Sequence, residues 1–532
     1  MHPASASASA SASASASIME GYDQLLTGIL RIKGQIHGSK KGKYRYLFQP
    51  YHTRLKPMLV YTSINRVQNG GEVLARVRFK EWGSEKYPSG ELVQKIGSTD
   101  DHKDVIDSWL YHYGLKVSVP TSVVLTPMPV QRKMFDAPVC SIDPPGCTDV
   151  DDAFHVEIGD LGYVLFVHIA CLGIMQTIPD SLWKKGFSLY LPDGRTVNLL
   201  PEHLVQNASL LAGKERIALT LEVEFDARGN MTDHKFYISG IINRQQLTYE
   251  QADRLRDPYW KGVRTLIGLI RSNGEFPCIR SREHKESIDS HLIVETMMIL
   301  YNHLGMKHLI TNGESPILRT HPSPTRGTQL APEKKVQVPE EFAKFLEFLE
   351  YSSAIYKLYQ PELPEEEFLH YGLSTHNYGH LTSPIRRLVD TYNQRLLLRT
   401  LSATQVTTDE PDVCNINAIE ARMRRFYRRT RIYKIHEAIG SEVIEDSVYP
   451  FHREEDGQYR FYWPAHGIIG KTGKCSGPVE LFHPLKVKIA VVFCPLPKLR
   501  VNLSNAGADA GANAGTDAGA NAGADAATVM PE

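Results

Sequence analysis

Apolar residues at every second position predict β-strands near the beginning of the chain. Residues 73–79 alternate in this way, and turn-forming residues at Gly70-Gly71 and around Pro88 separate neighbouring runs. Short strands at this spacing are typical of a small closed sheet. The pattern therefore predicts a small β-barrel over residues 20–115.

The other end of the chain repeats this pattern. Short apolar runs return at Phe461–Trp463 and Val487–Phe493, and they predict a second small barrel over residues 443–504. The two tails are different, because residues 1–19 are mostly Ala/Ser repeats and residues 505–532 mostly Ala/Gly/Asn/Asp repeats. Such segments bury too little apolar surface to offset chain entropy, so both tails are predicted to be disordered.

The middle of the chain, residues 116–442, mixes strand and helix patterns. Strands are predicted at Tyr163–Ile169 and Ile217–Phe225, and helices at His291–Ile310, at Glu340–Tyr356 and after Pro384. The predicted fold class is therefore a multidomain α/β protein, in which one large mixed α/β domain is flanked by two small β-barrels.

Composition narrows the class of protein. Of 532 residues, 42% are hydrophobic, and 60 basic residues balance 60 acidic ones, so a nucleic-acid site would have to be a local patch. The seven cysteines contain no CxxC pair, and the longest apolar run, Tyr163–Met175, is too short to span a bilayer. Because the first 17 residues have no apolar core, no signal peptide is expected. We predict a non-secreted protein of the cytoplasm, with the nucleus left open.

The first predicted barrel contains such a local patch. Between Arg31 and Lys56 there are eight Lys or Arg residues and no acid, with four aromatic residues, Tyr44, Tyr46, Phe48 and Tyr51, interleaved. Cations that neutralise phosphates, beside rings that stack on bases, suit single-stranded nucleic acid. An ordinary solvated strand face with aromatic residues in the core is an equally good interpretation.

The strongest chemical signal is a cluster of carboxylates. Asp143, Asp149, Asp151 and Asp152 lie within ten residues, without a Lys or Arg among them, and a Pro-Pro-Gly turn follows the first. So many like charges are costly together unless a cation binds, and hard oxygen ligands favour Mg²⁺ or Mn²⁺. Two such ions are a common device for phosphodiester cleavage. A solvated acidic loop is the alternative.

A second signal combines helix-capping residues with arginines. Thr382 and Ser383 precede Pro384, and Arg386 and Arg387 follow it. The pattern predicts a helix whose first turn carries both arginines and whose free N–H groups face an anion. Arginine opposes the helix dipole there, which favours a phosphate nearby. An ion pair with a neighbouring acid is the alternative.

A third signal is a basic segment at residues 422–434, which is predicted to be helical. Its cations are Arg422, Arg424, Arg425, Arg428, Arg429, Arg431 and Lys434, with no acid between them. The pattern fits a helix that faces a polyanion and equally a solvated helix with distant acidic partners.

These motifs belong to a longer series of segments. In chain order they are SIDPPGCTDVDDAFHV (141–156), HIA (168–170), YLP (190–192), LTYEQA (247–252), ILRTHPSP (317–324) and YGHLTSPIRRLVD (378–390). The series resembles the RNB family of exoribonucleases, over roughly residues 116–440. Residues 76–97 resemble the family's second cold-shock-type barrel, and residues 443–504 occupy the place of its C-terminal RNA-binding OB barrel.

The resemblance implies a hydrolytic 3′→5′ exoribonuclease that releases nucleoside 5′-monophosphates from single-stranded RNA at a Mg²⁺ centre, with Mn²⁺ as a substitute. It implies metal-site roles for Asp143, Asp149, Asp151 and Asp152, and catalytic roles for Asp151 and Arg386. RNA-binding roles are expected for Tyr190, Tyr249, His380, Thr382, Ser383 and Arg387. Tyr190 matches an aromatic residue that stacks on terminal bases, and Tyr249 a tyrosine near the sugar. We expect a monomer.

The chain departs from the family pattern in several places. Cys171 stands where an aspartate is usual, no acid occurs among residues 424–430, and the N-terminal region has length for one full barrel. These departures leave a second hypothesis open, namely a catalytically weak or inactive RNA-binding or regulatory member of the family. A nuclease that prefers DNA is a third.

Overall fold

The computed structural model describes most of the chain and divides it into two compact units. The described residues are 25–64, 71–83, 85–118, 133–175, 177–279, 288–323, 338–349, 353–401, 410–440, 442–473, 479–493 and 496–503. The first unit comprises Met1–Lys116, Arg326–Glu350 and Ala421–Glu532, and the second Val117–Thr325 and Tyr351–Glu420. The tails predicted to be disordered, 1–19 and 505–532, lie outside the described residues.

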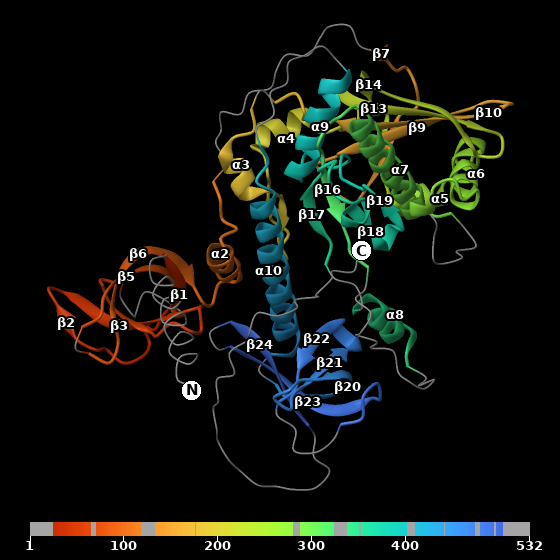
Figure 1. Cartoon of the computed structure of the whole chain (residues 1–532). Coiled ribbons are helices and arrows are strands. Elements are labelled where there is room, and N and C mark those ends of the chain that lie inside the picture. The colour runs from red at the N-terminus through yellow and green to blue at the C-terminus, as the bar shows by residue number, and fades with distance from the viewer. Residues whose placement is uncertain are drawn as a thin grey trace, which may run out of the picture. The chain divides into compact units, whose positions relative to one another are not determined.

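The first barrel is drawn in red and orange in Figure 1. It is a six-stranded sheet in the order β1-β5-β6-β4-β3-β2. Its strands are β1 Leu26–Leu30, β2 Ser39–Lys40, β3 Lys43–Pro50, β4 Met58–Thr62, β5 Val73–Glu81 and β6 Ser89–Ser98. Strand β1 pairs antiparallel with both β5 and β3, which closes the sheet. Leu30, Phe48 and Val77 are among the residues that fill its interior, and the predicted barrel is confirmed.

A helix that the sequence analysis missed follows this barrel. Helix α2, His102–His112, begins after Asp101, whose carboxylate accepts hydrogen bonds from the backbone N–H groups of Lys103 and Asp104. Its buried face includes Ile106 and Trp109. An acidic N-cap followed by apolar residues three apart is a helix signal that the barrel interpretation overlooked.

The second unit is built on a seven-stranded sheet in the order β15-β8-β9-β10-β13-β14-β7. The strands are β7 Lys133–Met134, β8 Cys140–Asp143, β9 Asp152–Ile158, β10 Gly162–Ala170, β13 Glu215–Asp226, β14 Met231–Ile242 and β15 Gln245–Thr248. The inner pairs are antiparallel, and the edge strands β15 and β7 pair in parallel. The predicted strands at 163–169 and 217–225 lie within β10 and β13 and are confirmed.

Helices and short hairpins complete this unit. The helices are α3 Asp180–Lys185, α4 Glu202–Ala208, α5 Tyr249–Arg254, α6 Pro258–Ser272, α7 Ser290–Thr311 and α9 Leu388–Leu401. The hairpins pair β11 Leu189–Tyr190 with β12 Thr196–Val197 and β18 Leu369–His370 with β19 Thr375–His376. A further two-stranded sheet pairs β16 Ile317–Thr320 with β17 Ile355–Leu358, which lie farther apart in sequence. Tyr301 of α7 donates to the Leu219 carbonyl of β13 at 3.0 Å, so α7 packs against the sheet. The helix predicted at 291–310 is confirmed as α7.

Two predicted helix boundaries are wrong. Helix α8, Glu340–Leu349, ends before Tyr356, which lies in β17 and pairs with Arg319 of β16. Helix α9 begins at Leu388, so Pro384 lies in a turn before it. In both cases a tertiary contact has replaced the local helical continuation that the side-chain spacing favoured.

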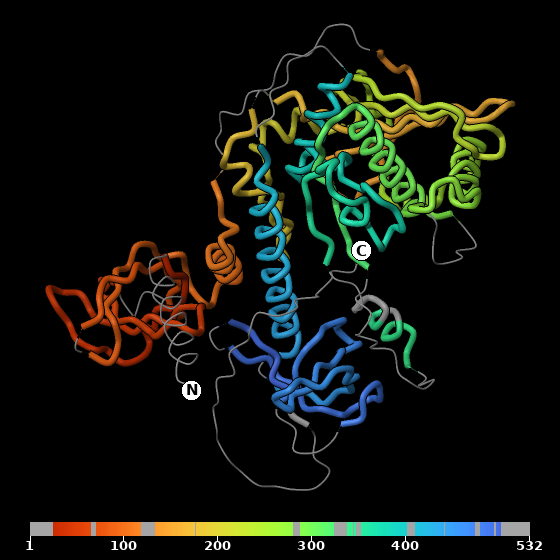
Figure 2. The backbone as a smooth tube through the Cα atoms, in the orientation of Figure 1, coloured from red at the N-terminus to blue at the C-terminus, as the bar shows by residue number. Residues whose placement is uncertain are grey.

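The second barrel has five strands in the order β22-β21-β20-β23-β24. They are β20 Ile444–Arg453, β21 Tyr459–Trp463, β22 Ile468–Lys471, β23 Leu485–Phe493 and β24 Pro497–Leu503. Its core includes Phe461, Trp463 and Ile435, the last from helix α10, Val413–Ile439. Figure 2 shows α10 as one unbroken helix. This barrel is also confirmed.

Within the described residues, every helix is too short or too polar to cross a bilayer.

Candidate active site

The four aspartates lie where two neighbouring strands of the central sheet meet. Strand β8 ends at Asp143 and its antiparallel neighbour β9 begins at Asp152. The turn between them is closed by a hydrogen bond from Cys147 N–H to the Pro144 carbonyl, 3.1 Å, and Gly146 adopts a positive φ of 77°. A side chain at that φ would be strained, so glycine suits the turn. The chain reversal brings the carboxylates to one end of these two strands.

A cavity of about 660 Å³ opens at this end of the strands, and every predicted site residue lines it. Asp143 ends β8, Asp149 and Asp151 lie in the β8–β9 loop and Asp152 begins β9. Tyr190 comes from β11 and Tyr249 from the start of α5. His380, Thr382, Ser383, Arg386 and Arg387 come from the loop before α9. The fold therefore gathers residues that are up to 244 positions apart in sequence, from Asp143 to Arg387.

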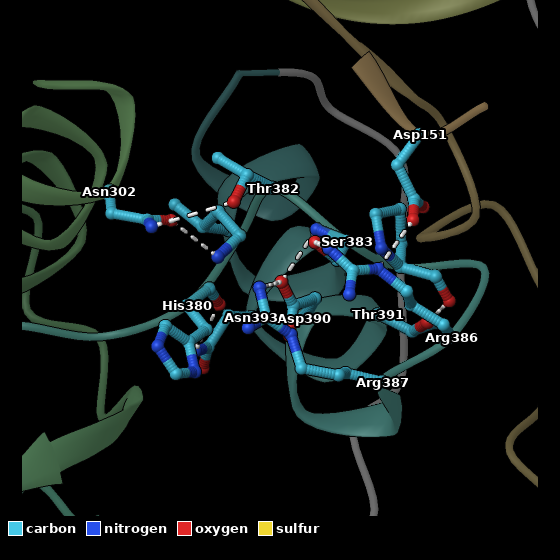
Figure 3. A network of polar contacts seen from close by, with 12 residues as sticks. Asp151, Asn302, His380, Thr382, Ser383, Arg386, Arg387, Asp390, Thr391 and Asn393 are labelled. Atoms are coloured by element: carbon cyan, nitrogen blue, oxygen red, sulfur yellow. Dashed lines mark hydrogen bonds and ion pairs between the residues drawn. The ribbon is translucent and has the colours of Figure 1, made fainter. Parts of the chain in front are cut away.

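Asp151 is the most tightly held of the four acids. It is 3% exposed, its Oδ1 accepts the backbone N–H of Ile385 at 2.9 Å, and its Oδ2 lies 3.3 Å from Arg386 Nε. Burial raises the pKa of Asp151 to about 8, although the Arg386 guanidinium opposes the shift. The Asp151 carboxylate thus links the β8–β9 loop directly to residues 380–387 before α9, the arginine loop (Figure 3).

The neighbouring acids share this desolvated environment. Burial raises the pKa of Asp143 to about 6, with Ser141, whose hydroxyl donates to Asp143 Oδ2 at 2.8 Å, opposing the shift. Burial also raises the pKa of Asp152 to about 7, and the charge of Asp143 adds to this effect. The pKa values of three carboxyl groups in one cavity are thus raised, because the neighbouring cations do not offset the cost of burying their negative charges.

The donor chemistry of this cluster fits a hard divalent cation, because all four side chains are carboxylates. Among the described residues, however, no three His, Cys, Asp or Glu side chains are arranged so as to hold a metal ion. Other partners account for part of this arrangement. Asp151 is engaged by Ile385 and Arg386, and Asp149 accepts a short hydrogen bond from the Tyr190 hydroxyl. The residue types of this cluster therefore fit a metal ion, and a metal-binding arrangement of the four carboxylates is a prediction.

The arginine loop differs from the predicted capped helix. Arg386 and Arg387 lie in the turn before α9, not in its first helical turn. Ser383 N–H donates to Asp390 Oδ1 at 2.7 Å, and Arg387 Nη2 donates to the same oxygen at 2.9 Å. The loop amide of Ile385 meets an anion, as predicted, but that anion is Asp151. The alternative of ion pairs with neighbouring acids is thus observed for both arginines (Figure 3).

Buried amide side chains that the sequence analysis did not single out hold this loop. Asn393 of α9 exchanges hydrogen bonds with the backbone of Ile317 and donates to the His380 carbonyl at 3.0 Å (Figure 3). Asn302 of α7 accepts from Leu381 N–H at 2.7 Å. Both amides are almost fully buried. In the sequence, an amide residue beside apolar residues of a helix could have indicated such a buried hydrogen-bonding role.

Gln394, the next residue of α9, joins two segments of the second unit. Its Oε1 accepts the N–H groups of Leu172 and Gly173 at 3.0 and 3.2 Å, and its Nε2 donates to the carbonyls of Ala170 and Leu381 at 3.0 and 3.3 Å. The side chain is fully buried. It therefore satisfies four backbone groups that would otherwise be left without these partners.

The two tyrosines occupy different settings in the cavity. Tyr190 is 45% exposed and donates to Asp149. Tyr249 is stacked on His291 of α7, with ring centroids 4.0 Å apart and planes 4° apart. Burial, followed by the charges of Asp152 and Asp143, raises the pKa of Tyr249 to about 12, so its hydroxyl stays protonated. An exposed ring and a fixed phenol are suited to contact a ligand.

Cys171 is not among the residues that line the cavity. The residue is 4% exposed, and its backbone N–H donates to the Ile217 carbonyl at 3.3 Å. Burial raises the pKa of its thiol to about 12. Cys171 is therefore a protonated core residue.

The basic and aromatic patch of the first barrel is only partly a surface. Tyr46, Phe48 and Tyr51 are buried, so for these rings the core interpretation is correct. Tyr44 stays 46% exposed. The guanidinium of Arg45 lies over the ring of Tyr61, 5.3 Å from its centroid.

The basic segment 422–434 forms part of helix α10, as predicted. Arg425, Arg428, Arg431 and Lys434 are exposed, whereas Arg429 donates to the Pro497 carbonyl of β24 at 2.7 Å. The helix thus carries an exposed basic face and also supports the second barrel.

Comparison with known proteins assigns this fold and site to a family. The model of the RNB domain matches residues 131–259 and 268–403, which include every predicted site residue. The chain belongs to the RNB family, and its architecture is a mixed α/β RNB domain with two small OB-like barrels.

Its relatives in sequence are nucleases. Ribonuclease R of Aquifex aeolicus is 26% identical over 519 residues, covering 76% of this chain and 71% of that protein. The exosome complex exonuclease RRP44 of Mus musculus is 24% identical over 475 residues, covering 74% of this chain. The chain spans 49% of the length of RRP44.

Solved structures share the fold at lower identity. RNase R of Mycoplasma genitalium, in complex with ribose-methylated single-stranded RNA, has a TM-score of 0.73 at 18% identity, covering 90% of this chain and 89% of that chain. Yeast Ssd1, described as a pseudonuclease, has a TM-score of 0.62 at 18% identity, covering 88% of this chain and 66% of that chain. The fold thus occurs in an RNase and in a pseudonuclease.

Proposed function

We propose that the protein is a hydrolytic 3′→5′ exoribonuclease that degrades single-stranded RNA to nucleoside 5′-monophosphates with Mg²⁺ or Mn²⁺. The observation that carries the proposal is the single cavity in which four aspartates, Arg386 and two tyrosines meet. In this proposal Asp143, Asp149, Asp151 and Asp152 hold the metal and Asp151 has the most direct catalytic role. A bound divalent cation would neutralise phosphate charge and activate water for attack.

Other side chains around the cavity are proposed to bind the phosphates of the RNA. Arg386 is oriented by Ser383, whose Oγ accepts from Arg386 Nη2 at 3.0 Å. Its planar guanidinium suits the developing charge on a phosphate once a cation neutralises Asp151. Thr382, Ser383, His380 and Arg387 also line the cavity and are proposed to contact the RNA backbone.

The tyrosines are proposed to orient the RNA end. The exposed ring of Tyr190 offers a stacking surface for a terminal base. Tyr249 keeps a protonated hydroxyl near Asp143 and Asp152, and we assign it to the sugar. The relative named ribonuclease R supports RNA as the substrate class. We further propose a monomer in the cytoplasm, and the five free cysteines among the described residues are compatible with a reducing compartment.

A time course on a 5′-labelled single-stranded RNA tests the activity. The wild type with Mg²⁺ should shorten the RNA from its 3′ end and release nucleoside monophosphate, whereas Asp151→Asn and wild type in EDTA should leave it intact. A DNA oligomer of the same sequence serves as the substrate control. Faster cleavage of DNA than of RNA would contradict the assigned substrate.

A second candidate is an RNA-binding member of the family without hydrolysis. One observation favours it, namely that no three potential ligands among the described residues are arranged so as to hold a metal ion. It predicts salt-sensitive RNA binding and no nucleotide release with any divalent cation. Monomer release that depends on both Mg²⁺ and Asp151 would exclude it.

A further inference from the structure

The second barrel has an aromatic surface outside its core. Along β21, Phe461 and Trp463 point into the barrel interior, and Tyr462 between them belongs to a separate cluster. That alternation is the pleat of a strand, so Tyr462 lies on the outer face. Phe451 and Tyr449 of β20 join it there.

Strands β20, β21 and β22 are the first three of the five strands of this barrel. In OB-type barrels the face of the second and third strands is where oligonucleotides bind. Aromatic side chains on such faces stack on bases of any identity. A cluster that contains Tyr462 and the neighbouring Ile469 of β22 is therefore where single-stranded RNA would be expected to stack.

Helix α8 covers this surface. Phe345 stacks on Tyr462 with ring centroids 4.3 Å apart and planes 15° apart, and Phe342 stacks on it at 5.6 Å and 7°. Phe345 also meets the edge of Phe451 at 5.6 Å. As a result Tyr462 is only 6% exposed and Phe342 is fully buried. Near-parallel rings at these distances are in the range of stacked aromatic pairs, which is also how a base would lie on Tyr462.

Charged residues also lie near the cluster. Helix α8 carries Glu340 and Glu341 in its first turn. Burial raises the pKa of Tyr462; the charge of Glu341 adds to this effect and that of Arg431 opposes it.

We propose that the outer face of β20–β22 binds the bases of single-stranded RNA and that α8 is an internal ligand of this face, so that α8 and RNA exclude one another. The identity of the ligand rests on the proposed function. The competition itself concerns binding at the second barrel and does not depend on chemistry at the aspartate cluster. Helix α8 would thereby set the affinity of the protein for RNA.

Equilibrium binding of a fluorescent single-stranded RNA in EDTA tests the competition without hydrolysis. Phe345→Ala weakens the α8 contact while Phe342 still anchors the helix, and it should raise RNA affinity about three- to tenfold. Phe493→Ala is the matched control, because Phe493 is a 44% exposed ring of β23 in the same barrel and lies outside the cluster. It should leave affinity unchanged.

Tyr462→Leu tests whether Tyr462 binds RNA only after the contact with α8 is weakened. In the wild type it should change RNA affinity less than twofold, because α8 already occupies the ring. In the Phe345→Ala background the same substitution should lower affinity about fivefold or more, the loss expected for one stacked base. Equal effects of Tyr462→Leu in both backgrounds would overturn the proposal.

Hydrogen exchange of the wild-type protein gives a test that needs no variant. Saturating RNA should speed exchange of the amides of residues 340–349, because the helix leaves its site. Unchanged or increased protection of α8 with RNA bound would overturn the proposal. These readouts remain informative if the protein releases no nucleotide, so the failure of competition and the failure of hydrolysis are distinguishable.

Discussion

Asp151 and Arg386 lie 3.3 Å apart, from carboxylate Oδ2 to guanidinium Nε, although 235 residues separate them along the chain. The pair joins the β8–β9 loop to the loop before α9. The carboxylate proposed to bind the cation is therefore the one that holds the arginine proposed to bind phosphate. A cation at Asp151 would take over part of that carboxylate's charge and leave the guanidinium available to a phosphate.

Asp151→Asn should abolish most hydrolysis while retaining RNA binding. Asparagine has nearly the same shape, and its Oδ1 can still accept the Ile385 N–H that Asp151 now accepts at 2.9 Å. We expect kcat to fall at least about 10²-fold, as when a group that stabilises transition-state charge is removed, with RNA affinity changed less than threefold. Asp136→Asn, at a fully exposed acid, is the matched control and should keep wild-type kcat.

The metal-free protein should lose stability as pH rises. Burial raises the pKa values of Asp143, Asp152 and Asp151 from a reference of 3.8 to about 6, 7 and 8. Because the folded state then binds protons more tightly than the unfolded state, the stabilisation is complete below pH 4 and is lost between about pH 4 and 8. In EDTA, Asp151→Asn should match the wild type at about pH 3.5, below the unfolded pKa, and melt a few degrees higher at pH 8.5.

Mg²⁺ provides the internal check on this pH dependence. A cation stabilises the ionised carboxylates, so Mg²⁺ should raise the melting temperature of the wild type more at pH 8.5 than at pH 5, and Asp151→Asn should respond less. A melting-temperature difference between variant and wild type that stays constant from pH 5 to 8.5 would contradict the raised pKa of Asp151.

Features encoded by local patterns could be predicted from the sequence. Strand β10 and helix α7 are apolar runs of strand and helix length, and the aspartate and arginine motifs mark the segments that meet in one cavity. What failed depends on tertiary contacts. Tyr356 continues a helical spacing, yet it pairs with Arg319 of β16 in a two-stranded sheet, and its hydroxyl forms a hydrogen bond with His380 Nδ1 at 3.0 Å.

The arginine loop shows the same limit at the site itself. Sequence can suggest that the amides before α9 meet an anion, but not that the anion is Asp151, because the bond from Ile385 spans 234 residues. It also cannot show that Tyr46 and Phe48 turn into the barrel while Tyr44 stays outside, since strand register decides that.

Gln394→Ala should destabilise the RNB domain strongly. It removes the acceptor for two N–H groups and the donor for two carbonyls, all in the segments around Ala170 and Leu381. Unsatisfied buried groups cost roughly 1–3 kcal/mol each, so we expect a loss of at least about 3 kcal/mol. Native-state hydrogen exchange of β10 and α9 measures it. Gln206→Ala, on the surface helix α4, should cost less than about 0.5 kcal/mol, and equal effects would contradict the network.

His291 should act as a positioning residue for Tyr249. The two rings lie 4.0 Å apart with planes 4° apart, and the adjacent Ser290 hydroxyl donates to the Tyr249 carbonyl at 3.1 Å. The start of α7 therefore fixes both the backbone and the ring of Tyr249 at the cavity wall. His291→Ala removes the ring contact and should raise KM for RNA about two- to tenfold, in line with the energy of one aromatic pair. Because Tyr249 is assigned to the sugar, the preference for RNA over a matched DNA should fall with it. His291→Phe keeps a ring to stack on Tyr249 and should restore both KM and the RNA preference, whereas a residue needed only for its imidazole would not be rescued by phenylalanine.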